Sequence, residues 1–261
     1  MSPIYVPGKV TLAKEFTWNE TVWNPSMIST ALWLDAADAS TITESGGAVS
    51  QWDDKSGNDR NATQGTSGSR PAIVLAGQNG LSIFRFDGSD DWLDAAYAMP
   101  IHNIGVFVAW KLNTGTGLNN KTVLGMRPVA DGRFYISSES HWKGAATINV
   151  TDNTDWRVSY LSGSSTQILA SINGGAVSTA SDANTATTAN VIIGAGSFSP
   201  GSSSPSGTTP HANCDLGEII MVTGTPSTDT RQRIEGYLAH KWGLTANLPS
   251  DHPYKTVGPT P

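Results

Sequence analysis

A polar loop in the first quarter of the chain carries the first side chains that could do chemistry. In the segment WDDKSGNDRNAT, Asp54, Ser56 and Asn58 alternate, and Gly57 permits a sharp turn. Oxygen ligands at alternate positions can wrap a hard cation such as Ca²⁺. The same side chains also form Asx turns without any ion. The loop lacks the spaced carboxylates and terminal Glu of an EF-hand loop, so turn chemistry is favoured over a calcium site.

A second candidate is an aromatic side chain in polar surroundings. The segment SSESHWKG places Trp142 between His141 and Lys143. An aromatic ring can stack on the apolar face of a sugar, so these three residues are candidates for a glycan contact. A contact between subunits would suit them equally well. Four other tryptophans lie in strand-like patterns and are predicted to be core: Trp33, Trp52, Trp110 and Trp156.

Patterns typical of catalysis are absent from the sequence. Retaining glycosidases place two carboxyl groups about 5–5.5 Å apart. Here Glu139 and Glu218 stand alone, and no G-x-S-x-G or H-E-x-x-H motif occurs. Four acidic residues could bind a cation or sugar hydroxyls, although a solvated turn is favoured: Asp87, Asp90, Asp91 and Asp94. These observations predict that the chain is not an enzyme.

Composition narrows the class of protein further. The chain has 261 residues, a formal net charge of −6 and one cysteine, Cys214. An acidic balance with scattered Lys and Arg argues against a nucleic-acid partner. No apolar run approaches the roughly 18 residues of a membrane span, and no secretory signal is visible at the N-terminus. We therefore expect no membrane insertion and a core built by burial alone.

The elements that must position these side chains are short strands. Runs such as ALWLDA, LSIFRF, GVFVAWKL, WRVSYL and GEIIMVT are bounded by Gly, Asn, Asp or Ser. Asn173-Gly174 predicts a tight hairpin turn, because both positions must take positive φ. Many short strands without intervening helices predict an all-β fold, an antiparallel sandwich of two sheets.

One helix is predicted, over about residues 228–242. Ser227 or Thr228 can serve as N-cap, and Gly243 can end the helix in a left-handed conformation. The apolar residues Ile234, Tyr237, Leu238 and Trp242 share one face. On the other face, Arg231, Glu235 and Lys241 are expected to stay in water.

The first 26 residues differ from the rest and predict an N-terminal arm, followed by a single domain over 27–261. Four aromatic residues stand in this Pro-broken segment: Tyr5, Phe16, Trp18 and Trp23. So short a segment cannot build a core of its own, so we expect these rings to pack on another polypeptide. A strand that completes the chain's own domain is the alternative.

Two long motifs frame the chain. LWLDAADASTITESGGAVSQWDDKSGNDRNATQ stands near the start and RQRIEGYLAHKWGLTANLPSDHPYK near the end. Together they resemble the concanavalin A-like (laminin-G-like) jelly-roll domains of phage virion proteins and bacterial surface proteins. The resemblance spans roughly residues 24–255 and implies a concanavalin A-like sandwich with one C-terminal helix. Many laminin-G-like domains bind calcium, whereas the glutamate of the GEIIMV strand looks structural in relatives.

The resemblance also implies a function. It suggests a non-enzymatic phage protein on the virion surface, either a tail fibre that binds the receptor or a head decoration, with a lectin-like domain for host glycans. The arm would then dock on other virion proteins, and a homo-oligomer, with a trimer the first guess, would strengthen weak glycan contacts. A purely structural cement or fibre module is the main alternative, and a glycan-cleaving enzyme is the weaker one.

The loop at Asp54, Ser56 and Asn58 yields the first testable prediction. If it holds Ca²⁺, calcium must raise the melting temperature, because a ligand that binds only the folded state stabilises it by mass action. The measurement is a thermal melt in calcium and in chelator. Identical curves would remove the calcium site and leave the turn.

Overall fold

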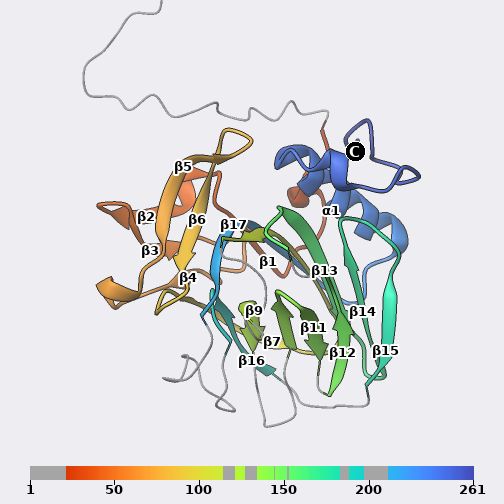
Figure 1. Ribbon diagram of the computed structural model, residues 1–261, viewed down its shortest axis with the longest axis horizontal. Coiled ribbons are helices and arrows are strands. Elements are labelled where there is room, and N and C mark those ends of the chain that lie inside the picture. The colour runs from red at the N-terminus through yellow and green to blue at the C-terminus, as the bar shows by residue number, and fades with distance from the viewer. Residues whose placement is uncertain are drawn as a thin grey trace, which may run out of the picture.

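The computed structural model describes most of the chain (Figure 1). The described residues are 22–113, 121–126, 134–143, 145–151, 153–182, 188–196 and 211–261, without the side chains of Ala96, Trp142 and Ala189. Of the predicted arm residues, Tyr5, Phe16 and Trp18 lie outside this part of the chain.

The described residues form strands throughout, with one α-helix near the C-terminus. The helix α1 spans Thr228–Lys241 and is followed by the 3-10 turn η4, Thr245–Asn247. The other 3-10 turns are η1 Pro25–Met27, η2 Ala39–Thr41 and η3 Ser67–Ser69. The strands are β1 Leu32–Asp35, β2 Ile42–Ser45, β3 Ala48–Trp52, β4 Ala62–Thr63, β5 Ala72–Gln78, β6 Leu81–Asp87, β7 Leu93–Pro100, β8 Ile104–Leu112, β9 Thr122–Met126, β10 Phe134–Ser137, β11 Ser140–Lys143, β12 Ala146–Asn149, β13 Arg157–Gly163, β14 Gln167–Ile172, β15 Ser178–Ser181, β16 Thr188–Ile193 and β17 Asn213–Thr223.

These strands pair antiparallel into one sheet that curls into a nearly closed barrel. Strand β17 pairs with β1, β6 and β8, and the sheet continues through β13 and β14 to β15. A second series of pairings begins at β5 and passes through β3, β4, β7, β16, β9, β10 and β11 to end at β12. The two ends meet across the interior, where β12 contacts β14 and β15. The predicted all-β antiparallel fold with one helix is confirmed.

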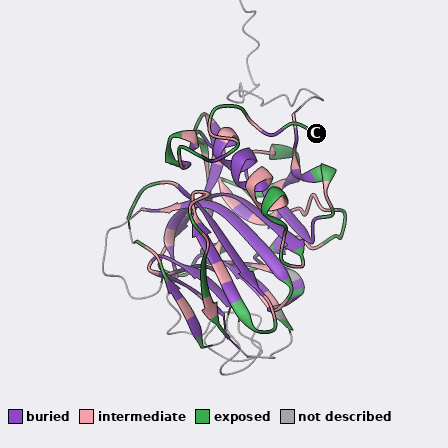
Figure 2. Cartoon of the chain, turned by 90° about the vertical axis from the view of Figure 1, so that its right-hand side faces the viewer, coloured by how far each residue is buried: buried purple, intermediate pink, exposed green. Residues whose placement is uncertain are grey.

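Strand β8 shows why the sequences of the central strands are unbroken runs of apolar residues. Its alternate residues Val106, Val108 and Trp110 belong to the core inside the curled sheet. The intervening Phe107 and Ala109 belong to a second core between the sheet and α1. Both faces of the strand are therefore buried, as Figure 2 shows for the central strands. Trp33, Trp52 and Trp110 are buried as predicted.

Helix α1 begins and ends where the sequence predicts. The Ser227 hydroxyl accepts a hydrogen bond from the amide of Thr230, and Gly243 has a φ of +70°. Ile234, Tyr237 and Leu238 are buried on the outer face of the sheet. In the part of the chain that the structure describes, no helix is long and apolar enough to cross a membrane.

The prediction that Glu235 and Lys241 stay in water is wrong. Both side chains are buried. The ammonium of Lys241 contacts the carboxylates of Asp35 at 2.6 Å and Glu218 at 2.8 Å. Glu235 is held by the guanidinium of Arg231 at 2.8 Å. The prediction considered only that both residues are charged. Each of them forms an ion pair inside the fold, and the pairing permits its burial.

Glu218 is the centre of the buried network around Lys241. Its Oε1 accepts hydrogen bonds from the Trp33 indole at 2.7 Å and the Tyr237 hydroxyl at 2.9 Å. Its Oε2 accepts one from the Trp242 indole at 3.0 Å. The network joins β17 to β1 and α1, the elements that begin the first framing motif and carry the start of the second.

Burial and ion pairing shift the pKa values of the two carboxyl groups of this network in opposite directions. Burial by itself would raise the pKa of Asp35, but the ammonium groups of Lys241 and Lys55 hold it below its usual value. For Glu218, burial dominates and raises the pKa, although Lys241 opposes the shift. The positive charge of Lys241 is thus needed by both acids.

The assignment of Trp23 to a free arm is also wrong. Its ring is buried and meets Tyr237 edge-on, with 5.9 Å between centroids. Its amide donates to the carbonyl of Pro259 at 3.1 Å. Burial of the large apolar ring beside α1 is favoured over its exposure to water, so Trp23 is part of the domain's own packing.

Replacing Lys241 tests the importance of the buried network. We expect Lys241→Met to lower the free energy of unfolding by about 3–5 kcal/mol, because it leaves the buried carboxyl group of Glu218 without its cation and that of Asp35 with Lys55 alone. Chemical denaturation measures the change. The control is Arg233→Met on the same helix, which removes the exposed pair with Asp229 and should cost less than about 1 kcal/mol. Equal effects of the two substitutions would contradict this role for Lys241.

Candidate functional site

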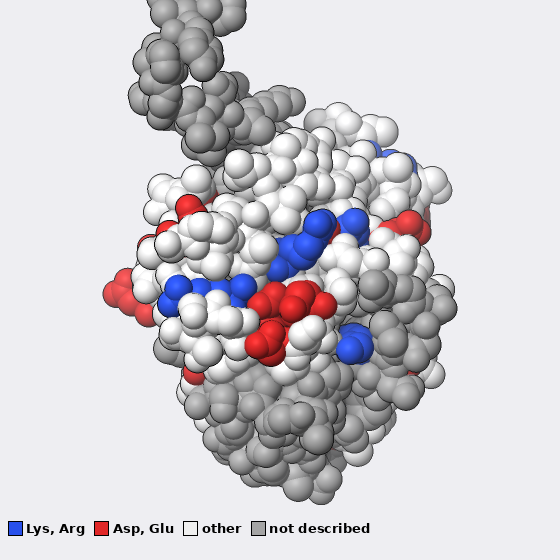
Figure 3. Space-filling view, turned by 60° about the vertical axis from the view of Figure 1, so that its left-hand side comes forward, with Lys and Arg blue, Asp and Glu red and all other residues white. Residues whose placement is uncertain are grey.

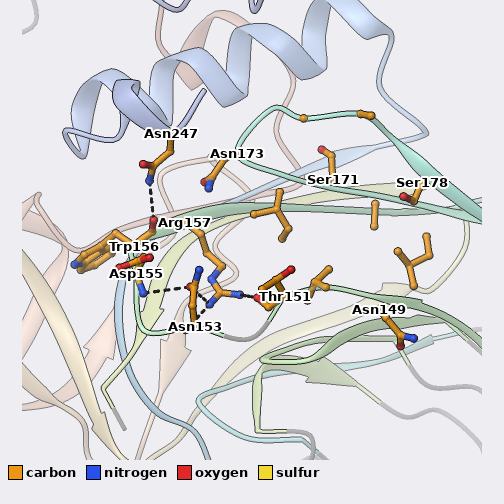
Figure 4. Close-up of a pocket in the computed structure, with 16 residues that line it drawn as sticks. Asn149, Thr151, Asn153, Asp155, Trp156, Arg157, Ser171, Asn173, Ser178 and Asn247 are labelled. Atoms are coloured by element: carbon orange, nitrogen blue, oxygen red, sulfur yellow. Dashed lines mark hydrogen bonds between the residues drawn. The ribbon is translucent and has the colours of Figure 1, made fainter. Parts of the chain in front are cut away.

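A cavity of about 500 Å³ lies between the segment that leads from β12 to β13 and the hairpin β14–β15 (Figure 4). Its lining is rich in neutral polar side chains. The polar lining residues are Asn149, Thr151, Asn153, Asp155, Arg157, Ser171, Asn173, Ser178 and Asn247, with Trp156 beside them. We call this cavity the β12–β15 pocket.

The turn between β14 and β15 forms one wall of the pocket. Asn173 and Gly174 have φ values of +53° and +68°, as the Asn-Gly pair predicts. Both conformations are left-handed, which Asn tolerates and Gly adopts freely. The Asn173 Oδ1 accepts a hydrogen bond from the amide of Val158 at 2.8 Å, which ties the turn to β13.

Arg157 holds the opposite wall. Its guanidinium donates to the carbonyl of Thr151 at 3.1 Å and to the carbonyl and side chain of Asn153. It also lies over the ring of Trp110, 5.0 Å from the centroid. The side chain is buried, so Arg157 acts as an internal brace for the segment that leads from β12 to β13.

Trp156 gives the pocket its aromatic surface. The prediction that it is a core residue is only partly right, because it is half-buried and lines the pocket. Its ring is stacked on Trp242 with centroids 6.1 Å apart and an angle of 5° between planes. The backbone carbonyl of Trp156 accepts a hydrogen bond from Asn247 at 3.0 Å. The position of Trp156 thus depends on α1 and η4.

The residues predicted to contact a glycan lie elsewhere. His141 and Lys143 are fully buried, so their prediction as surface contacts is wrong. Lys143 forms an internal ion pair with Asp182 at 2.6 Å. His141 pairs in register with Ile148, which lines the β12–β15 pocket. The side chain of Trp142 lies outside the described residues.

The loop around Asp54 has the geometry of a hydrogen-bonded turn. The Asp54 carboxylate accepts hydrogen bonds from the amides of Trp33 and Ser56, both at 2.9 Å, and from the Ser56 hydroxyl at 2.6 Å. The Asn58 amide donates to the carbonyls of Thr30 and Ala31. Asp54 therefore fixes the loop on β1 through a carboxylate oxygen, whereas Asn58 holds the segment before β1 through its amide nitrogen.

Within the described chain, three other carboxyl groups could hold a metal ion. Ligand oxygens of Asp87, Asp90 and Asp91 lie within 4.8 Å of one another. Burial raises the pKa of Asp91 to about 6, and the neighbouring carboxylates add to the shift. The fourth predicted member, Asp94, lies apart from this group and accepts from Asn190 at 3.2 Å. On the face shown in Figure 3, acidic side chains lie beside basic ones. Near Asp87 in the chain, Arg85 pairs with Asp215 at 2.7 Å.

Comparison with known proteins shows a likeness of fold. No protein-family model matches the sequence, and no curated protein matches it. The structure is similar to Trypanosoma rangeli sialidase in complex with sialic acid, with a TM-score of 0.53, 10% identity, and coverage of 82% of this chain and 33% of the sialidase. It is also similar to the botulinum neurotoxin serotype D ligand binding domain in complex with N-acetylneuraminic acid, with a TM-score of 0.52, 11% identity, and coverage of 79% of this chain and 50% of that one.

The chain thus spans about a third of the sialidase and half of the toxin domain. At these identities the likeness concerns the fold alone and transfers neither activity nor ligand. It does correct one prediction. The chain was predicted not to be an enzyme because paired carboxylates are missing, but sialidases, which are enzymes, share this fold. That exclusion is therefore wrong.

The burial of His141 yields a prediction about acid stability. Burial lowers its pKa to about 4, and Arg157 adds to the shift. The unfolded chain binds a proton at this residue below its ordinary pKa of about 6.5, whereas the folded protein does not. Between these values stability must fall as the pH falls. From pH 7 to 4, wild type should lose about 3 kcal/mol more than His141→Leu in denaturation measurements. Equal losses would contradict a neutral, buried His141.

Proposed function

We propose that this chain is a glycan-binding module and that the β12–β15 pocket is its binding site. The observation that carries the proposal is the lining of the pocket, in which amide and hydroxyl side chains line the same cavity as the half-buried Trp156. Saccharides present alternating hydroxyl groups and apolar C–H faces. Neutral hydrogen-bonding groups match the hydroxyls, and an aromatic ring matches the C–H face.

Preorganisation of the pocket supports the proposal. Trp156 is stacked on Trp242, Asn173 is tied to β13, and Asn153 is braced by Arg157. A side chain that is already held in place loses little conformational entropy when a ligand binds. The pocket can therefore bind a small polar ligand without first ordering its walls.

The type of β fold and the biological setting are inferred from the resemblance of the two framing motifs. They favour a concanavalin A-like sandwich as the type of β fold and a phage virion surface as the setting. There the module would attach the particle to host glycans, as part of a tail fibre or a head decoration. Residues 1–26 would then contribute to docking on other virion proteins, and a homo-oligomer such as a trimer would add avidity.

Replacing Trp156 tests the proposed function. We expect Trp156→Ala to weaken binding to an immobilised saccharide roughly tenfold or more, because the stacking surface is lost. Trp156→Phe should retain part of the affinity. The control Leu75→Ala removes an exposed apolar side chain from β5 and should leave binding unchanged.

A glycan array measures the binding, and thermal melts verify that each variant is folded. Release of sugar from the same saccharides is followed in parallel, which separates binding from cleavage. If the wild-type protein binds no saccharide but binds virion proteins, the proposal is overturned in favour of a structural module.

A further inference from the structure

We infer that the β12–β15 pocket selects neutral saccharides and disfavours those that carry a carboxylate, such as sialic or uronic acids. The inference rests on the proposed function and specifies its ligand class. It follows from where the charges of the pocket lie, since a binding site for an acidic sugar needs a cation that the ligand can reach.

Of the lining residues that the structure describes, Arg157 is the only basic one. Its guanidinium faces the protein, where it donates to the carbonyls of Thr151 and Asn153 and lies over Trp110. With 2% of the residue exposed, it offers a ligand almost no surface. The guanidinium of Arg157 therefore braces the wall of the pocket. It is not available for the bidentate hydrogen bond that a carboxylate favours.

Asp155 adds a negative charge to the lining of the pocket. It is exposed and is the only acidic residue among the described residues that line the pocket. In Figure 4 it lies next to Trp156, the surface on which a sugar would stack. A carboxylate on the ligand would meet a like charge here, and like charges repel at short range.

The remaining polar groups suit hydroxyls. The asparagines use one end of the amide to hold position: Asn173 and Asn153 accept through Oδ1, and Asn247 donates through Nδ2. Among the described residues, the other ends of these three amides have no protein partner. Two NH₂ groups and one carbonyl thus remain for a ligand, and a sugar hydroxyl can both accept and donate.

The test is an array that carries neutral saccharides, such as N-acetyllactosamine, beside their sialylated or uronic acid counterparts. We expect the affinity for each bound neutral saccharide to exceed the affinity for its acidic counterpart by about fivefold or more. This ratio corresponds to the repulsion between two unit charges about 4 Å apart in water. Asp155→Asn should narrow this ratio by about the same factor. The control Glu44→Gln removes a charge from the exposed strand β2, outside the pocket, and should leave the ratio unchanged.

Salt provides a second measurement that needs no variant. Binding of a neutral saccharide should not change between about 0.05 and 0.5 M salt, because screening acts only between charges. Acidic saccharides that bind as well as neutral ones, or better, would overturn the inference and leave the proposed function standing. No binding to any saccharide would overturn both.

Discussion

The buried ammonium of Lys241 ties the C-terminal helix to the sheet. It lies between the carboxylates of Asp35 and Glu218, and each of these acids comes from a different strand. Buried charges are tolerated only when they are paired and hydrogen-bonded, so the three groups must come together or none can be buried. The result is that β1, β17 and α1 have one relative arrangement.

Backbone geometry makes room for this arrangement. Strand β17 has a bulge between Leu216 and Glu218, which shifts its register against β8. The bulge residue is Gly217, and a Cβ atom there would lie 2.8 Å from the Trp242 ring. Only glycine allows the indole to approach so closely and reach Glu218. One small residue thus permits the contact between the sheet and the helix.

The same contact extends to the β12–β15 pocket. Trp242 is bonded to Glu218 on one side and stacked on Trp156 on the other. Ser171 of the pocket donates to Glu235 of α1 at 3.0 Å. The helix and Trp242 at its C-terminal end position the aromatic ring and one wall of the pocket. A structural helix and a binding surface are therefore parts of one packed unit.

Local patterns in the sequence were enough to predict the all-β class, the bounds of α1 and the Asn173-Gly174 turn. Each of these depends on neighbours along the chain: alternation, a capping hydroxyl, or a φ that glycine accepts. The pocket was not predicted, although the polar run around Trp156 was a signal for it, because its walls come from segments about 20 to 90 residues apart. Burial also reversed the roles of His141, Lys143 and Lys241, which look like surface residues by type. Whether a polar side chain meets water or a partner depends on contacts between distant strands, which no local pattern in the sequence contains.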